Sequence, residues 1–187
     1  MPGLLFDTDT PELLTEPRFA ACRVATYADL VTPALCQELR GRLVVIDRGL
    51  GDPMGLASVA DIEPGALTVA SAAERMHAWQ QQGRPFVTAY HDRAVQQDVD
   101  QATAGMGIFN WVATLDGTLL PDGRTRAAVQ FAGAASLGFH ADLSIVWDDS
   151  WHPLPAAPPP VLVADIKHFA AEALGYAGAL AGAVKML

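Results

Sequence analysis

The sequence is poor in positive charge and in cysteine, and each shortage argues against a class of protein. Its 12 Lys and Arg residues are outnumbered by 21 Asp and Glu residues, giving a formal net charge of −9. Such a chain does not offer the basic groove that nucleic acids require. Only two cysteines occur, Cys22 and Cys36, and neither has the CxxC spacing of a metal or redox motif. We therefore expect no nucleic-acid partner, and we interpret both cysteines as small buried thiols.

Signals for targeting and cofactor binding are also missing. Residues 1–19 show no basic segment followed by an apolar one, so we predict no signal peptide and synthesis in the cytoplasm. No apolar run is long enough to cross a bilayer, and we expect no membrane insertion. The Gly-rich segment 49–55 lacks GxGxxG spacing and a Walker lysine, and HExxH and GxSxG motifs are absent. We therefore predict neither a metal nor another cofactor.

What the sequence does contain is a series of short apolar runs alternating with helical patterns. The runs that predict strands are 19–27, 42–47, 56–63, 84–92, 107–117, 126–133 and 141–149. Most are nearly continuous in apolar residues, as in strands buried on both faces of a parallel sheet or barrel. Segments 32–41 and 68–83 have a threonine N-cap and a glycine stop, and 93–105 is a weaker helical pattern. Strand and helix in alternation predict an α/β fold.

The number of strands and the chain length together limit the architecture. A complete eightfold (β/α) barrel typically needs about 250 residues, and the links 48–56 and 133–141 are too short for helices. We therefore predict that residues 1–153 form a small, degenerate TIM-like (β/α) barrel of seven or eight strands, with several helices missing.

Polar residues follow several of the predicted strands, and Asp61 and Glu63 are the most informative of them. Residues i and i+2 of a strand project to the same side, so these two carboxylates are expected to share one mouth of the barrel. Active sites of parallel barrels lie at that end of the strands. The pair is compatible with a catalytic pair of divergent pKa, with a metal clamp, or with a polar strand end before the turn at Pro64 and Gly65.

The last part of the sequence has a different pattern. Residues 154–163 are rich in proline and predict a semi-rigid linker, whereas 164–187 predict a helix. Its apolar positions form a heptad seam, and Gly178 and Gly182 are spaced as in closely packed helix pairs. We interpret 164–187 as an assembly helix that docks to further copies of the chain or to another structural protein. Packing of this helix on its own barrel is the alternative.

The order of the motifs is similar to that of a known family. The segments VADIEPG, RPFVTAYHD, FNWVATLDGT, AAVQFAG and HADLSIVWDDSWHP resemble, in order, the later strands of the glycoside hydrolase family twenty-five lysozymes. These are muramidases with a DxE motif, and the resemblance covers about residues 56–152. The chain looks like the degenerate type that actinobacterial phages and their hosts encode.

The resemblance implies a small irregular barrel and roles for several residues. Glu63 matches the family's general acid, and Asp61 matches the partner carboxylate of the DxE motif. The family's first strand carries a further Asp, for which Asp29 or Asp47 could stand in, and we take Asp47 as the third catalytic candidate. Tyr90, Trp111, Gln130 and Asp142 match groove-lining positions of the family. Independently of the resemblance, Trp111 and Trp151 are candidates for aromatic platforms that bind sugar faces, so all five are predicted to bind substrate.

Two functions from different classes agree with this pattern. The first is a phage virion-associated or surface protein whose barrel binds cell-wall glycan or acts as a scaffold, docked to an assembly through 164–187. The second is an active peptidoglycan glycosidase that uses Glu63 as general acid. The incomplete acid set favours the first. A third carboxylate that reaches Glu63 would favour the second, because glycoside hydrolysis needs a protonated acid and an ionised carboxylate.

Overall fold

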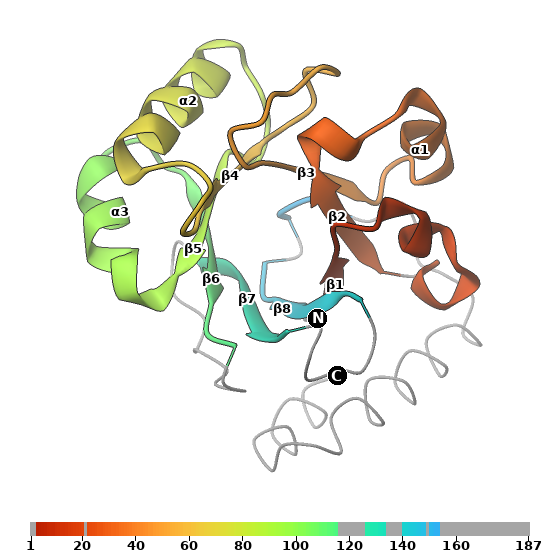
Figure 1. Ribbon diagram of the computed structural model, residues 1–187. Coiled ribbons are helices and arrows are strands. Elements are labelled where there is room, and N and C mark those ends of the chain that lie inside the picture. The colour runs from red at the N-terminus through yellow and green to blue at the C-terminus, as the bar shows by residue number, and fades with distance from the viewer. Residues whose placement is uncertain (1–2, 21, 116–125, 134–139, 149, 154–187) are drawn as a thin grey trace.

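The barrel predicted from the sequence is present in the computed structural model, which describes residues 3–20, 22–115, 126–133, 140–148 and 150–153. The predicted linker and helix at 154–187 lie outside the described residues. Eight strands of the described part close a barrel in chain order, and Figure 1 shows them as a ring. They are β1 (Gly3–Asp7), β2 (Arg23–Tyr27), β3 (Leu43–Asp47), β4 (Val59–Ile62), β5 (Thr88–Asp92), β6 (Phe109–Ala113), β7 (Arg126–Ala132) and β8 (Asp142–Val146).

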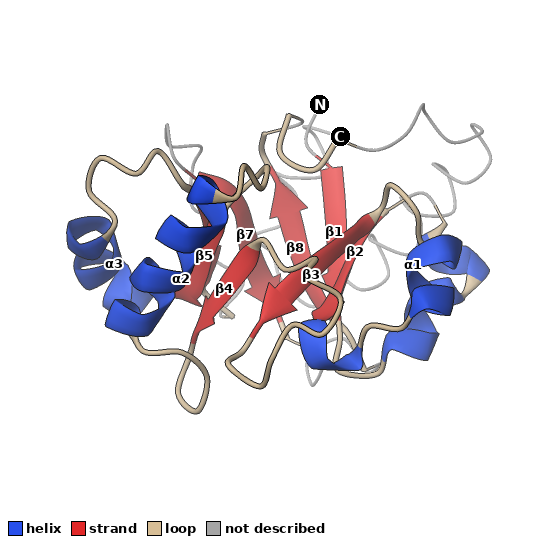
Figure 2. Cartoon of the chain, turned by 90° about the horizontal axis from the view of Figure 1, so that it is seen from above, coloured by secondary structure: helices blue, strands red, loops and turns tan. Residues whose placement is uncertain are grey.

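The strands differ in direction, and this defines the two ends of the barrel. Neighbours from β1 to β7 are parallel. In contrast, β8 is antiparallel to both β7 and β1, and in Figure 2 its arrowhead points the opposite way to those of β3 and β4. The C-terminal ends of β1–β7 therefore meet the start of β8 at one end, called the mouth below, and the opposite end is the base. The fold is a closed, mixed α/β barrel with few helices.

The helices lie outside the ring, where the sequence predicted them. They are α1 (Pro33–Glu38), α2 (Val69–Gln81) and α3 (Gln96–Ala102), with 3-10 turns η1 (Pro11–Thr15), η2 (Pro17–Phe19), η3 (Ala28–Leu30) and η4 (Arg93–Val95). Both predicted threonine caps are confirmed: the Thr32 hydroxyl accepts a hydrogen bond from Leu35 N, and that of Thr68 accepts one from Ser71 N. In Figure 1, α2 and α3 cover one flank of the ring and α1 lies on the other.

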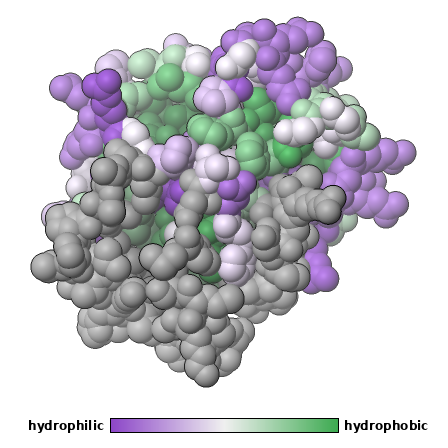
Figure 3. Space-filling model, turned by 180° about the vertical axis from the view of Figure 1, so that it is seen from behind, coloured by the Kyte–Doolittle hydropathy of each residue, from purple (hydrophilic) through white to green (hydrophobic). Residues whose placement is uncertain are grey.

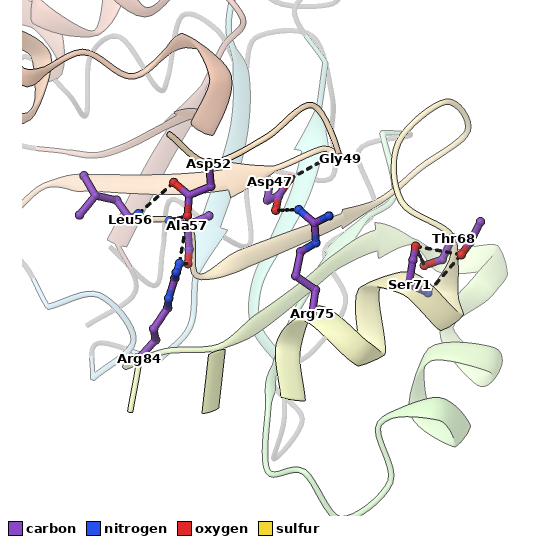
Figure 4. A network of polar contacts seen from close by, with 9 residues as sticks. All are labelled: Asp47, Gly49, Asp52, Leu56, Ala57, Thr68, Ser71, Arg75 and Arg84. Atoms are coloured by element: carbon purple, nitrogen blue, oxygen red, sulfur yellow. Dashed lines mark hydrogen bonds and ion pairs between the residues drawn. The ribbon is translucent and has the colours of Figure 1, made fainter. Parts of the chain in front are cut away.

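The link between β3 and β4 contains no helix, as expected from its length, and a polar anchor replaces one. The Asp52 carboxylate accepts hydrogen bonds from Leu56 N and Ala57 N, and it forms an ion pair with Arg84 (Figure 4). The same guanidinium also donates to the Ala57 carbonyl at 2.6 Å. Because one carboxylate satisfies several donors, the loop is fixed without secondary structure of its own.

The core is divided by the barrel wall. Inside the ring, Leu5, Ile46, Val59 and Trp111 belong to one buried cluster. Outside it, a second cluster lies beneath α2 and α3, and a third beneath η1, η2 and α1. On the face opposite to that of Figure 1, hydrophobic residues lie between hydrophilic margins (Figure 3). Strands buried on both faces explain why their sequences are continuously apolar.

One strand was not predicted. The N-terminal β1 pairs with β2 on one side and with β8 on the other, and it completes the ring. Its sequence, GLLFD, contains only three apolar residues before Asp7. The pairing on both sides buries Leu5 and Phe6 almost completely, so tertiary contacts stabilise a segment whose local pattern is short.

Candidate functional site

Four carboxylates from three strands gather at the mouth of the barrel. Asp7 ends β1, Asp61 lies in β4 with Glu63 directly after that strand, and Asp142 begins β8. The register places Asp7 opposite Asp142, and Asp61 opposite Tyr90 of β5. Because β8 runs antiparallel, its first residue reaches the same end of the barrel as the last residues of the parallel strands.

Burial and mutual repulsion make these acids hard to ionise together. Burial, followed by the charges of Asp142, Glu63 and Asp61, raises the pKa of Asp7 well above its usual range. Burial and then the charge of Glu63 raise the pKa of Asp61 to about 7. Burial also raises the pKa of Glu63, which is only half-buried. Clustered carboxyl groups of this kind hold protons at neutral pH.

Hydrogen bonds fix the acids in place. Glu63 is hydrogen-bonded to the Tyr90 side chain, which favours its ionised form and opposes the effect of burial on its pKa. The Asp61 carboxylate accepts a hydrogen bond from Glu63 N at 3.0 Å. On the other side, Gln130 Nε2 donates to Asp142 Oδ2 at 2.9 Å. The expected neighbour Tyr90 therefore lies beside the DxE pair, and Gln130 lies beside Asp142.

A pocket of about 340 Å³ opens at the mouth beside Asp7. Its lining consists of Asp7, Thr8, Asp9, Tyr27, Arg48, His140, Ala141 and Asp142. Two buried acceptor atoms near this region, Asp7 Oδ2 and Gln130 Oε1, have no hydrogen-bond partner. Buried polar atoms without a partner are rare in folded proteins. They provide this end of the barrel with acceptors that a ligand's hydroxyl or amide hydrogens can satisfy.

The structure corrects the choice of Asp47 as the third catalytic acid: it ends β3 at the mouth, but its side chain lies outside the ring, away from Glu63. Val44 and Ile46 of β3 face the interior of the barrel, whereas Val45 belongs to the cluster beneath α2. By the alternation of strand residues, Asp47 lies on the same side as Val45. It pairs there with Arg75 of α2 and accepts a hydrogen bond from Gly49 N, as Figure 4 shows. Asp47 thus fastens α2 to the barrel wall.

The structure also corrects the expected sugar platforms. Trp111 and Trp151 are completely buried. Trp111 Nε1 donates to Ser144 Oγ at 3.0 Å, and its ring lies 4.8 Å from that of Tyr90. Trp111 therefore belongs to the core and packs against Tyr90.

Trp151 lies at the other end of the barrel. Its Nε1 donates to Oγ1 of Thr88, the first residue of β5, and its ring contacts that of His152. Arg23, the first residue of β2, donates to the His152 carbonyl at 2.7 Å. The segment therefore lies at the base, at the end of the strands opposite to the acids, and the Trp151 ring lies 5.9 Å from that of Trp111.

Asp7 is the site residue that the sequence analysis missed. Its segment LLFD repeats the arrangement of VVID at 44–47, an apolar run that ends in an acid. That signal was present, but it does not tell which acids face inward. In the closed ring Asp7 lies on the same side of β1 as Leu5, which belongs to the cluster inside the barrel, and it forms a register pair with Asp142.

Comparisons with known proteins identify no relative. No protein-family model matches the chain, and neither does a curated protein or a solved structure. Among the described residues, no group of three or more His, Cys, Asp or Glu side chains is arranged to hold a metal ion. Nor does any helix in this part of the chain combine the length and hydropathy of a membrane span. Function must be inferred from the acids at the mouth.

Replacing Asp61 by Asn is expected to stabilise the protein at pH 8 but not at pH 4. A carboxyl whose pKa rises from 3.8 to about 7 on folding stabilises the folded state below pH 4, and this contribution is lost as the pH rises toward 7. Asn does not titrate and keeps the oxygen that accepts from Glu63 N. We expect the difference in unfolding free energy at pH 8 to be on the order of 4 kcal/mol in favour of the variant.

Urea denaturation at the two pH values measures this difference. The depressed pKa of His152, about 4, changes stability with pH in both proteins alike and cancels in the comparison. Asp98→Asn, on the exposed side of α3, is the matched control and should show no such pH dependence. An Asp61→Asn protein that is less stable than wild type at both pH values would contradict the electrostatic account.

Proposed function

We propose that this chain is a glycoside hydrolase that cleaves the sugar backbone of peptidoglycan, with Glu63 as its general acid. The observation that supports the proposal is the set of acids around Glu63. Asp61 precedes it in the DxE motif, and the charge of Asp142 raises its pKa. Glu63 in turn raises the pKa of Asp7. The third acid chosen from the sequence, Asp47, pairs with Arg75 instead.

The arrangement suits the chemistry of glycosidic bonds. Hydrolysis requires a protonated acid at the leaving oxygen and an ionised carboxylate that stabilises the positive charge of the sugar ring. Like charges in a buried cluster cannot all ionise, so some carboxyl groups keep a proton at a pH at which others are charged. Glu63, half-buried and reachable from solvent, is suited to donate. Asp7 keeps its proton, because burial and the neighbouring acids raise its pKa well above the usual range, and Asp61 and Asp142 are the acids that supply the negative charge.

The structure changes the balance between the two functions considered from the sequence. The family's first-strand Asp had no convincing counterpart, and this favoured a non-catalytic role. Asp7, the last residue of the first strand, supports the enzyme as the proposed counterpart of that residue. We therefore favour the enzyme, and we propose that the barrel is a degenerate TIM-like (β/α) barrel whose site lies at the mouth.

We also propose where the enzyme acts. Association with a phage virion or a cell surface, through docking of 164–187 to copies of the chain or to another structural protein, rests on the sequence pattern alone. The observations at the mouth neither require nor oppose this docking.

Incubation of the protein with purified peptidoglycan tests the proposal. We expect new reducing ends to accumulate with time, and borohydride reduction followed by mass spectrometry should identify them as N-acetylmuramic acid ends. New ends of N-acetylglucosamine would retain a glycosidase but assign it to the other bond. Sedimentation of the protein with peptidoglycan without new ends would instead support the non-catalytic, glycan-binding function.

A further inference from the structure

Arg48 introduces a positive charge into an otherwise acidic pocket. It follows β3 and lines the pocket at the mouth together with Tyr27, Asp7 and Asp142. The other ionisable groups of this lining are Asp9 and His140. Arg48 is therefore the permanent cation among the described residues that line the pocket, and none of the functions above assigns it a role.

The Arg48 guanidinium is held rigidly. Its Nε donates to Asp29 Oδ1 at 3.0 Å and its Nη2 donates to Asp29 Oδ2 at 2.6 Å, so one edge of the group is fully used. The guanidinium also lies over the Tyr27 ring, with its central carbon 4.3 Å from the ring centroid. A bidentate carboxylate and an aromatic face together fix both the position and the plane of an arginine.

The opposite edge of the guanidinium is available to a ligand. Within the described part of the chain, Nη1 of Arg48 makes no hydrogen bond, and its side chain keeps about a quarter of its surface exposed, 27%. A preorganised edge of this kind binds a carboxylate with little loss of side-chain entropy. Elsewhere the pocket wall carries Asp7, Asp9 and Asp142, which repel an anion. The charges therefore orient a bound ligand: its anionic group lies at Arg48, and its hydroxyl or amide hydrogens point toward Asp7 Oδ2.

We propose that this pocket is a subsite for a sugar that carries a carboxylate, and that Arg48 is its specificity-determining residue. The choice of sugar rests on the proposed function: the lactyl carboxyl group of an N-acetylmuramic acid unit has the required chemistry. N-acetylglucosamine lacks only that lactyl ether. The pocket therefore distinguishes the two alternating sugars of the glycan and sets which bond lies beside Glu63.

Binding of the two monosaccharides to the full-length wild-type chain tests the proposal, with amide chemical shifts in NMR spectra as the readout. We expect N-acetylmuramic acid to bind about tenfold more tightly than N-acetylglucosamine, the effect of one charge-assisted hydrogen bond. Arg48→Gln should remove that preference while leaving the affinity for N-acetylglucosamine unchanged. Arg40→Gln, which removes an exposed arginine after α1, is the matched control and should keep the preference.

A salt dependence and a second variant complete the test of Arg48. Raising the salt concentration should reduce the preference of the wild-type protein, because the contact is between charges. Asp29→Asn should weaken the preference without removing Arg48, and it serves as the second variant if Arg48→Gln does not fold. Equal binding of the two sugars by the wild-type protein, or an unchanged preference in folded Arg48→Gln, would overturn the proposal. Neither sugar is cleaved in this assay, so a lack of peptidoglycan hydrolysis contradicts the proposed function alone.

Discussion

Replacing Glu63 by Gln is expected to lower the rate of glycan cleavage by about a thousandfold. A positioned general acid commonly contributes two to four orders of magnitude, about 10²–10⁴. Gln has nearly the same shape and can accept the hydrogen bond from Tyr90, but it has no proton to give to the leaving oxygen. The initial rate at which reducing ends appear measures the loss.

The same variant should keep its fold. Glu63 follows β4 and is half-buried. Burial raises its pKa, so its negative charge does not stabilise the folded state. We therefore expect the melting temperature to change by no more than a few degrees. Glu74→Gln, on the exposed face of α2, is the matched control and should retain full activity. A folded Glu63→Gln protein with the wild-type rate would remove Glu63 from the mechanism.

Most of the barrel could be predicted from the sequence because its strands and helix caps are local signals. Continuous apolar runs marked seven of the eight strands of the described chain, and Thr32 and Thr68 marked helix starts. The strand β1 was missed because a run of three apolar residues carries little local information. Its stability depends on pairing with β2 and β8, which are distant in sequence.

The direction of β8 shows what the pattern of apolar residues leaves open. Buried strands have the same composition in parallel and antiparallel pairs, so composition suggested a parallel barrel. Link length is the better guide, since a parallel crossover needs a dozen residues or more. Only nine residues separate Ala132 from Asp142, and the two strands form an antiparallel pair. This reversal is what places Asp142 at the mouth.

Only part of the candidate site could be predicted, because the sequence does not show which residues of a strand face the interior of the barrel. Asp61 and Glu63 were predicted to lie on one side because residues two apart in a strand share a face; in the structure Asp61 lies in β4 and Glu63 follows it, and both raise the pKa of Asp7. Asp47 ends an apolar run just as Asp61 does, but both faces of β3 are apolar, so the sequence does not show which residues point inward. In the structure Asp47 faces α2 and Arg75. The same ambiguity applied to Trp111, whose full burial makes it part of the core.

The role assigned to Asp7 is the central claim, because this residue turns an isolated DxE pair into a complete set of acids. Asp7 is only 6% exposed, and its Oδ2 has no hydrogen-bond partner. Its raised pKa also means that the folded protein would be as stable, or more stable, at neutral pH without this titratable group. A buried group that is neither paired nor stabilising is typical of a functional site rather than of the core.

The rate of reducing-end release by Asp7→Asn, relative to wild type, tests this claim most directly. The variant keeps the size of the side chain but cannot exchange a proton with the other acids, so we expect the rate to fall by about a hundredfold or more and the melting temperature at pH 7 to stay the same or rise. The rate of the Asp98→Asn control should not change. A folded Asp7→Asn protein that releases reducing ends at the wild-type rate would contradict the assignment of Asp7, Asp61, Glu63 and Asp142 to one catalytic site.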